Sequence, residues 1–121
     1  MTAAVRKITT ANTTNLTQVK DGATASLKGI AALNTTAAAI FLKFYWYVPT
    51  PNNPIPTVGT TVPDITIELP ALGTTTGNVL QSWPDGLQKA GLLFLAVTNL
   101  AADSDATVVA SGSGIISVFY E

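Results

Sequence analysis

The sequence predicts an all-β protein, a single-domain antiparallel β-sandwich of the jelly-roll type with eight or nine short strands. Turn-forming residues punctuate the whole chain of 121 residues, and the apolar segments between them are shorter than typical helices but long enough for strands. Thr, which is β-branched and favours an extended backbone, is frequent between the apolar positions. Short strands separated by regular turns are typical of a sandwich or jelly roll.

The expected strands follow one another along most of the chain. In chain order they cover residues 5–9, 16–20, 25–33, 39–48, 64–69, 78–83, 92–100, 107–110 and 115–120. The polar run at residues 9–15 indicates that residues 1–15 form an N-terminal arm, with residues 16–121 as the sandwich domain. A frayed end without function is the alternative.

The segment at residues 39–48 is the most aromatic of these strands. Side chains alternate across a pleated strand, so the segment has two distinct faces. The face expected to enter the core consists of Ile40, Leu42, Phe44, Trp46 and Val48. The opposite face consists of Phe41, Lys43, Tyr45 and Tyr47. Because Tyr is enriched where proteins meet, the second face predicts a surface for binding or assembly.

Two later strands differ in their expected exposure. Residues 64–69 alternate between apolar and polar side chains, which predicts a strand with one wet face. Residues 92–97 (LLFLAV) have no polar face, so this strand is expected to be central or to be covered by a neighbouring subunit. A short buried helix is the alternative, but Gly91 before the run and the shortness of the run favour a strand.

Proline and glycine mark the connections between strands. Residues 49–59 hold four of the seven prolines, which predicts a stiff loop. This loop either projects as a contact site, through Pro51, Asn52 and Asn53, or is a long connection that crosses from one sheet to the other. The pairs Asp21-Gly22 and Asp85-Gly86 predict tight turns.

The composition limits the class of partner. A net charge of −1 with scattered basic residues argues against binding of nucleic acid, which requires a clustered basic surface. No apolar run approaches the roughly 20 residues of a spanning helix, and residues 1–11 lack the apolar core of a secretory signal. We therefore expect a soluble protein with neither a nucleic acid nor a membrane as partner. Without Cys, no disulfide or thiolate metal site is possible.

The inventory of catalytic groups is small. The chain has no His and no Cys, so the usual nucleophiles and bases are missing. Asp64 and Glu68 could serve glycoside hydrolysis, but their spacing puts both on one wet strand face. Asp103-Ser104-Asp105 resembles the start of a calcium loop without its later Gly and Glu, which favours an Asp-rich turn. We predict no enzyme, no metal and no cofactor.

Each of the two tryptophans has two interpretations. A Trp in a strand more often fills the core with its indole N–H bonded nearby, and this is expected of Trp46. Trp83 stands just before Pro84 at a strand end, where partial exposure is more plausible. It is the better candidate for contact with a sugar or a protein partner.

Several short motifs follow one another along the chain. They are residues 12–22 (NTTNLTQVKDG), 27–30 (LKGI), 41–45 (FLKFY), 56–60 (PTVGT), 63–67 (PDITI), 84–87 (PDGL) and 101–107 (AADSDAT). Taken in this order, they resemble the motifs of small structural proteins in tailed bacteriophage virions. The resemblance covers most of the chain after residue 12. Members of this group are short β-sandwich proteins, several of which decorate or cement the capsid. The chain departs from the pattern at residues 49–55 and at Trp46-Tyr47, which predicts a partner-specific loop.

The resemblance implies a binding role without catalytic residues. The implied function is a decoration or cement protein on the outer surface of the capsid, with the major capsid protein as partner and a homo-oligomer, preferably a trimer, as the assembled form. The residues expected at its contacts are Asn12, Thr13, Phe41, Tyr45, Tyr47, Pro51, Asn52, Asn53 and Trp83. One alternative is a tail, baseplate or fibre component of the virion. Another is a carbohydrate-binding module that stacks sugars on Trp83 and Tyr47.

Overall fold

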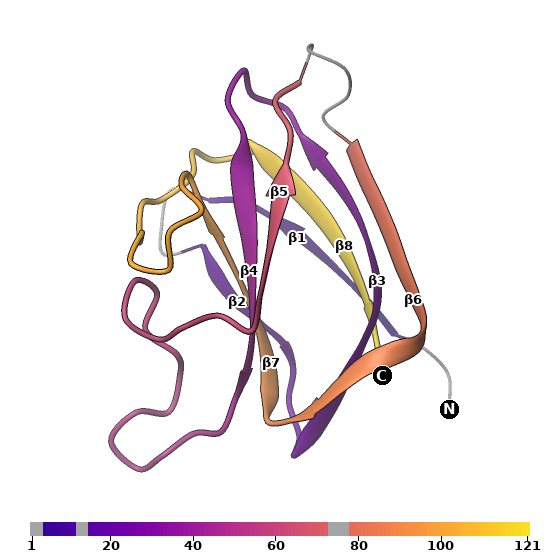
Figure 1. The fold of residues 1–121 in the computed structure, drawn as a ribbon, viewed down its shortest axis with the longest axis vertical. Helices are drawn as coiled ribbons and strands as arrows, with labels where there is room; N and C mark the ends of the chain where they lie inside the picture. Colours follow the sequence, from indigo (N-terminus) through magenta and orange to yellow (C-terminus); the bar gives the residue numbers. More distant parts are fainter. Residues whose placement is uncertain (1–3, 12–14, 73–77) are drawn as a thin grey trace.

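A computed structural model describes residues 4–11, 15–72 and 78–121, and these residues form eight β-strands and no helix. The strands are β1 (Ala4–Thr9), β2 (Leu16–Lys20), β3 (Thr24–Asn34), β4 (Ile40–Tyr47), β5 (Ile65–Leu69), β6 (Asn78–Ala90), β7 (Leu92–Thr98) and β8 (Gly114–Tyr120). Figure 1 shows them as two layers that face each other across a common core.

The strands pair in the order of a jelly roll. One sheet has the order β1-β8-β3-β6 and the other the order β2-β7-β4-β5. The antiparallel pairs β1 with β8, β2 with β7, β3 with β6 and β4 with β5 are those of one long hairpin that has been rolled up. This arrangement is the double-sheet jelly roll and confirms the fold class that the sequence predicts.

The space between the sheets is filled by the inward side chains of both. From β4 these are Ile40, Leu42, Phe44 and Trp46, all buried. They meet Ile30, Leu93, Leu95, Ile116 and Val118 from neighbouring strands and the facing sheet. The predicted core face of residues 39–48 is thus confirmed up to Trp46, whereas Val48 lies beyond the strand and is 65% exposed. Each large side chain buried in this way contributes about 1.5–3 kcal/mol to stability.

Two predicted features at the later strands are wrong. Residues 107–110 are not a strand, because the Val109 carbonyl accepts a hydrogen bond from the side-chain amide of Asn15 instead of a neighbouring strand. Asp85-Gly86 is not a hairpin turn, because β6 continues through it to Ala90. The register of β3 with β6 shifts between Leu27 and residue 29, so the extra residues of β6 form a bulge in which Gly86 has φ +78°.

The beginning of the chain differs in part from the expected arm. Residues 4–9 form β1, which pairs along its length with β8 and supplies Ile8 to the core. This segment of the predicted arm therefore belongs to the sandwich, and the predicted strand at residues 5–9 is confirmed. The predicted contact residues Asn12 and Thr13 lie outside the described residues.

Two of the connections that cross from one sheet to the other turn at a glycine. Gly22, in the expected Asp21-Gly22 turn, joins β2 to β3 with φ +127°, and Gly91 joins β6 to β7 with φ +120°. These φ values favour glycine, which has no Cβ. At Gly91 a Cβ would also lie 2.9 Å from the backbone nitrogen of Tyr47, whereas nothing lies within 4 Å of one at Gly22.

Candidate interaction surfaces

The outer face of the β2-β7-β4-β5 sheet is covered by the chain itself. The loop between β4 and β5 and the loop between β7 and β8 lie on the left of Figure 1, on the side of β4 and β7 that faces away from β3 and β6. Tyr45, Phe94 and Ala96 form a second hydrophobic cluster there, against which Val58 of the first loop packs. β7 lacks a polar face because it is central in its sheet and covered on both sides by its own chain.

Lys43 holds the second of these loops in place. Its side chain is completely buried, and Nζ donates hydrogen bonds to the carbonyl oxygens of Ala102 at 2.6 Å and Asp105 at 3.1 Å. A buried ammonium requires such acceptors, since an unpaired charge is costly away from water. The single charge of the aromatic strand is therefore a structural tether of residues 99–113.

The Asp105 carboxylate closes the same loop. It accepts hydrogen bonds from the Leu100 amide at 3.0 Å and the Thr107 hydroxyl at 2.7 Å. Desolvation acts to raise the pKa of Asp105, but the hydrogen bonds from Thr107 and Leu100, together with the charge of Lys43, outweigh it and hold the pKa below its ordinary value. The described residues contain no cluster of three or more potential metal ligands. The interpretation of residues 103–105 as an Asp-rich turn agrees with this geometry.

Tyr45, one of the expected contact residues, lies beneath the loops. Only 1% of its surface is exposed, so it is not available to a partner in this conformation. Its hydroxyl has no hydrogen-bond partner among the described residues. Burial, with a smaller effect of the Asp103 charge, raises the pKa of Tyr45. The phenol therefore stays neutral and acts as an apolar filler between the sheet and its cover.

Tyr47 anchors the exposed tip of the proline-rich loop. Its hydroxyl donates to the Asn53 carbonyl at 3.0 Å, and its ring meets Phe94 edge-on with the ring centroids 6.4 Å apart. The backbones of Thr50 and Asn53 bond each other in both directions at 3.1 Å. Pro51 and Asn52, at the apex, are exposed. The expected contact residues Pro51, Asn52 and Asn53 thus form a preorganised, solvent-facing turn.

The path of this loop corrects one expectation. β4 and β5 are neighbours in one sheet, so residues 48–64 do not cross to the other sheet but fold over their own. Beside the loop is a hollow of about 340 Å³ without a charged side chain in its lining. Its apolar walls are Leu16, Ile55, Pro56, Val58, Ala96 and Val108. Phe41 lies on the same outer face and is partly buried.

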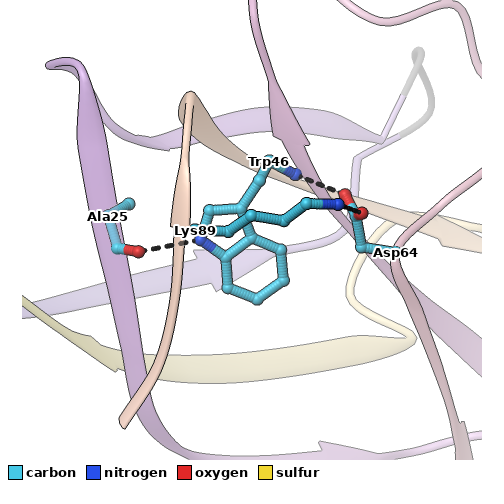
Figure 2. A network of polar contacts seen from close by, with 4 residues as sticks. All are labelled: Ala25, Trp46, Asp64 and Lys89. Atoms are coloured by element: carbon cyan, nitrogen blue, oxygen red, sulfur yellow. Dashed lines mark hydrogen bonds and ion pairs between the residues drawn. The ribbon is translucent and has the colours of Figure 1, made fainter.

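Asp64 is engaged in structure at the start of β5 (Figure 2). Its carboxylate accepts from the backbone amide of Trp46 at 2.8 Å and is paired with Lys89. The Trp46 indole donates to the Ala25 carbonyl at 2.9 Å, which confirms the core interpretation of Trp46. Glu68 remains an exposed residue of β5. The arrangement gives Asp64 a role in joining β4, β5 and β6.

Trp83 is partly buried and packs against the main core. It lies on β6, whereas Tyr47 lies on β4 in the opposite sheet and is held by Phe94 and Asn53. The two rings therefore do not form a shared platform on which a sugar could stack.

The outer face of the β1-β8-β3-β6 sheet combines apolar and polar side chains from four strands and was not predicted from the sequence. Strand register aligns twelve outward positions in three rows across this sheet, which we call the open face. The rows are Thr9, Ile115, Leu33 and Asn78; Lys7, Ser117, Ala31 and Leu80; and Val5, Phe119, Gly29 and Ser82. Leu80 is 83% exposed and Val5 57%. Lys7 is the single charged residue of the twelve.

The middle of the open face is hollowed. The small side chains of Ala31 and Ser117 lie between bulkier neighbours, and the depression has a volume of about 370 Å³. The alternation of Ile115, Ser117 and Phe119 with buried residues of β8 was a signal in the sequence. These three residues belong to a larger face only because β1 and β3 lie beside β8, and the sequence does not show which strands are neighbours.

The scan of protein families and the searches of curated proteins and solved structures found no match to this chain. The described part of the chain also contains no helix of the length and apolarity that crossing a membrane requires.

Proposed function

We propose that this protein is a structural component of a tailed-phage virion that binds the outside of the capsid as a decoration or cement protein. Its partner would be the major capsid protein, and it would act as a homo-oligomer. The observation that supports the proposal is that the outer sides of the two sheets of one jelly roll offer two separate surfaces as candidates for contact. These are the open face and the loop side, which comprises the tip at residues 50–53 and its adjoining hollow.

A cement protein stabilises a shell when it binds the assembled state more tightly than the free capsid protein, which it does by bridging adjacent capsid subunits. Two surfaces on one subunit suit such a bridge. The tip suits contact with the shell because Tyr47 and the paired backbones of Thr50 and Asn53 fix its shape before binding, which reduces the entropic cost of association.

A role in binding agrees with the use of the acidic side chains. The carboxylates of Asp64 and Asp105 both accept hydrogen bonds from neighbouring backbone amides, so each has a structural explanation. Many weak contacts repeated over a shell gain strength through raised effective concentration. Modest interfaces per chain are therefore sufficient for firm attachment.

The decisive experiment is a cryo-EM reconstruction of the virion that carries this protein. Density for the jelly roll is expected over the capsid surface, with residues 50–53 against the shell. Density confined to the tail, baseplate or fibres would overturn capsid decoration and support the alternative assigned to those parts.

A binding assay tests the loop tip separately. The double variant Pro51→Gly and Asn52→Ala should bind isolated shells at least about tenfold more weakly, because it loosens and truncates the apex. Thr66→Ala, at an exposed position of β5 in the same sheet, is the matched control and should bind normally. Equal binding by both variants would exclude the tip as the contact.

A further inference from the structure

We propose that the open face binds a second copy of this chain, sheet against sheet, about a two-fold axis that runs parallel to the strands. The inference deepens the proposed role, because the open face is one of the two surfaces on which that role rests, and it specifies a dimer in place of the trimer expected from the sequence. It follows from the composition of the three rows, from the one charge they contain, and from the area they offer.

The open face combines apolar and polar outward positions. Six of the twelve positions are apolar side chains, and Gly29 provides a further flat position. Those six are Val5, Ala31, Leu33, Leu80, Ile115 and Phe119. Two sheets that pack face to face lie about 10 Å apart with their strands within about 30° of each other. Interfaces of non-obligate complexes are about 56–58% apolar by area, so this mixed composition suits a weak dimer.

The position of Lys7 selects the direction of the axis. A two-fold axis perpendicular to the strands would place each strand over its own copy, so the two Lys7 ammonium groups would face each other in an apolar interface. An axis parallel to the strands instead places β1 over β6 of the second copy, at opposite edges of the interface. Each Lys7 then lies beside the second copy's Leu80, where its apolar stem can pack and its ammonium can reach water.

The same axis matches large side chains with small ones. It places Phe119 of β8 over Gly29 of β3 in the second copy, and Ser117 over Ala31. The perpendicular axis would place Phe119 over Ile115, two bulky side chains, and Leu33 over Gly29. All three rows pair with themselves when the axis is parallel to the strands, whereas the perpendicular axis exchanges the two outer rows and pairs only the middle row with itself.

The area indicates a weak dimer. Three outward positions along each strand and four strands spaced by about 4.8 Å give a flat patch of about 400 Å² per copy. Two copies bury about 800 Å² before side-chain relief is counted, which is below the roughly 1,200 Å² of a stable specific interface and falls in the range of weak, transient contacts. We therefore expect association at micromolar or higher protein concentration, which a crowded shell surface would provide.

The test is the mass of the full chain by sedimentation velocity over a concentration series. Wild type should pass from monomer to dimer as concentration rises. Leu80→Arg should raise the dimer dissociation constant at least about tenfold; the side chain is 83% exposed, so the fold should survive. Val62→Arg adds the same charge at a loop position that is 68% exposed and should dimerise like wild type. Ala31→Arg gives a second disruption at the centre of the depression.

Cross-linking tests the axis, because the chain contains no natural Cys. A mixture of Val5→Cys and Ser82→Cys proteins should form a heterodimer with a short thiol-reactive cross-linker, and Ser82→Cys alone should not. Leu80 faces its own copy only under the perpendicular axis, so efficient cross-linking of Leu80→Cys to itself would overturn the proposed axis. A monomer at every concentration, a trimer, or a dimer insensitive to both Arg variants would overturn the proposed contact.

Discussion

At the scale of single residues, the side chains with the strongest effect on the loop side are polar groups in an apolar setting. Lys43 and Tyr45 lie two positions apart on the outer face of β4, and both are buried beneath the loops. The Lys43 ammonium has carbonyl acceptors, whereas the Tyr45 hydroxyl has no partner among the described residues. Removing the ammonium of Lys43 should therefore lower the stability of the fold, whereas removing the hydroxyl of Tyr45 should not.

Lys43→Met should lower the free energy of unfolding by about 1–3 kcal/mol, because it leaves the carbonyls of Ala102 and Asp105 without their donor. Amide exchange in residues 99–106 should accelerate in parallel. Lys89→Met is the control, since an exposed ion pair contributes about 0–1 kcal/mol. Urea unfolding and hydrogen exchange measure both effects, and equal losses in the two variants would contradict the tether.

Tyr45→Phe should leave stability unchanged or raise it by up to about 1 kcal/mol, because it removes a buried hydroxyl that lacks a hydrogen bond. Tyr47→Phe removes a hydroxyl that is bonded to Asn53 and should lower stability by about 0.5–1.5 kcal/mol. Thermal unfolding of Tyr45→Phe and Tyr47→Phe measures both changes in stability. A clear loss of stability in Tyr45→Phe would show that its hydroxyl is bonded in solution.

The lowered pKa of Asp105 predicts acid sensitivity of the loop. Because the folded pKa lies below the unfolded value of about 3.9, the stabilisation is complete above that value and is lost as the pH falls through the folded pKa. The difference in stability between wild type and Asp105→Asn should therefore shrink as the pH is lowered through this range. Urea unfolding of both proteins between about pH 2 and 6 measures this difference in stability. A difference that does not change with pH would show that the acid sensitivity comes from a carboxylate other than Asp105.

At the scale of elements, alternation was informative wherever a strand has one core face. The inward residues of β4 were predicted correctly from their period of two, as was the wet face of β5. The continuation of β6 past Pro84 was missed, because a bulge and a hairpin turn use the same residues, Asp85-Gly86. Only the pairing of β6 with β3 on both sides of the bulge distinguishes them.

The corners between sheets provide a test at this scale. Gly22→Ala and Gly91→Ala force Ala into nearly the same unfavourable φ, so each should lose about 1–3 kcal/mol. Gly91→Ala should lose more, because its Cβ would also collide with the backbone of Trp46 and Tyr47. Chemical denaturation measures both losses of stability. Equal losses in the two variants would show that the β4 backbone moves away from the new Cβ at residue 91 without cost.

At the scale of the whole molecule, both candidate surfaces depend on which elements become neighbours. The aromatic face of β4 looked like an interface, yet loops that follow β4 and β7 cover it. The open face combines side chains from β1, β3, β6 and β8, and several of its positions are small residues that no single strand marks as part of a surface. Periodicity within a strand predicts which residues share a face, but it does not predict what lies above that face.

The pairing of β1 with β8 predicts the behaviour of a circular permutant. Ala4 and Tyr120 are partners in register, so a short flexible linker could join residue 121 to residue 1, with new ends opened between Pro51 and Asn52. The permutant should fold to the same jelly roll and refold faster than wild type, because β8 and β1 become a local hairpin. Stopped-flow fluorescence of the two tryptophans, Trp46 and Trp83, measures the rate. Slower refolding would show that an intact connection at residues 49–63 contributes more to the folding nucleus than the new link between β8 and β1.

The same pairing has a consequence for biosynthesis. During translation β1 is made early, but its partner in the sheet is formed by residues 114–120. At synthesis rates of about 5–20 residues per second, the nascent chain spends several seconds with β1 unpaired and with the apolar inner surfaces of both sheets accessible. Folding to the complete jelly roll must therefore await the synthesis of β8, and until then the apolar strands of the chain lack the neighbours that bury them.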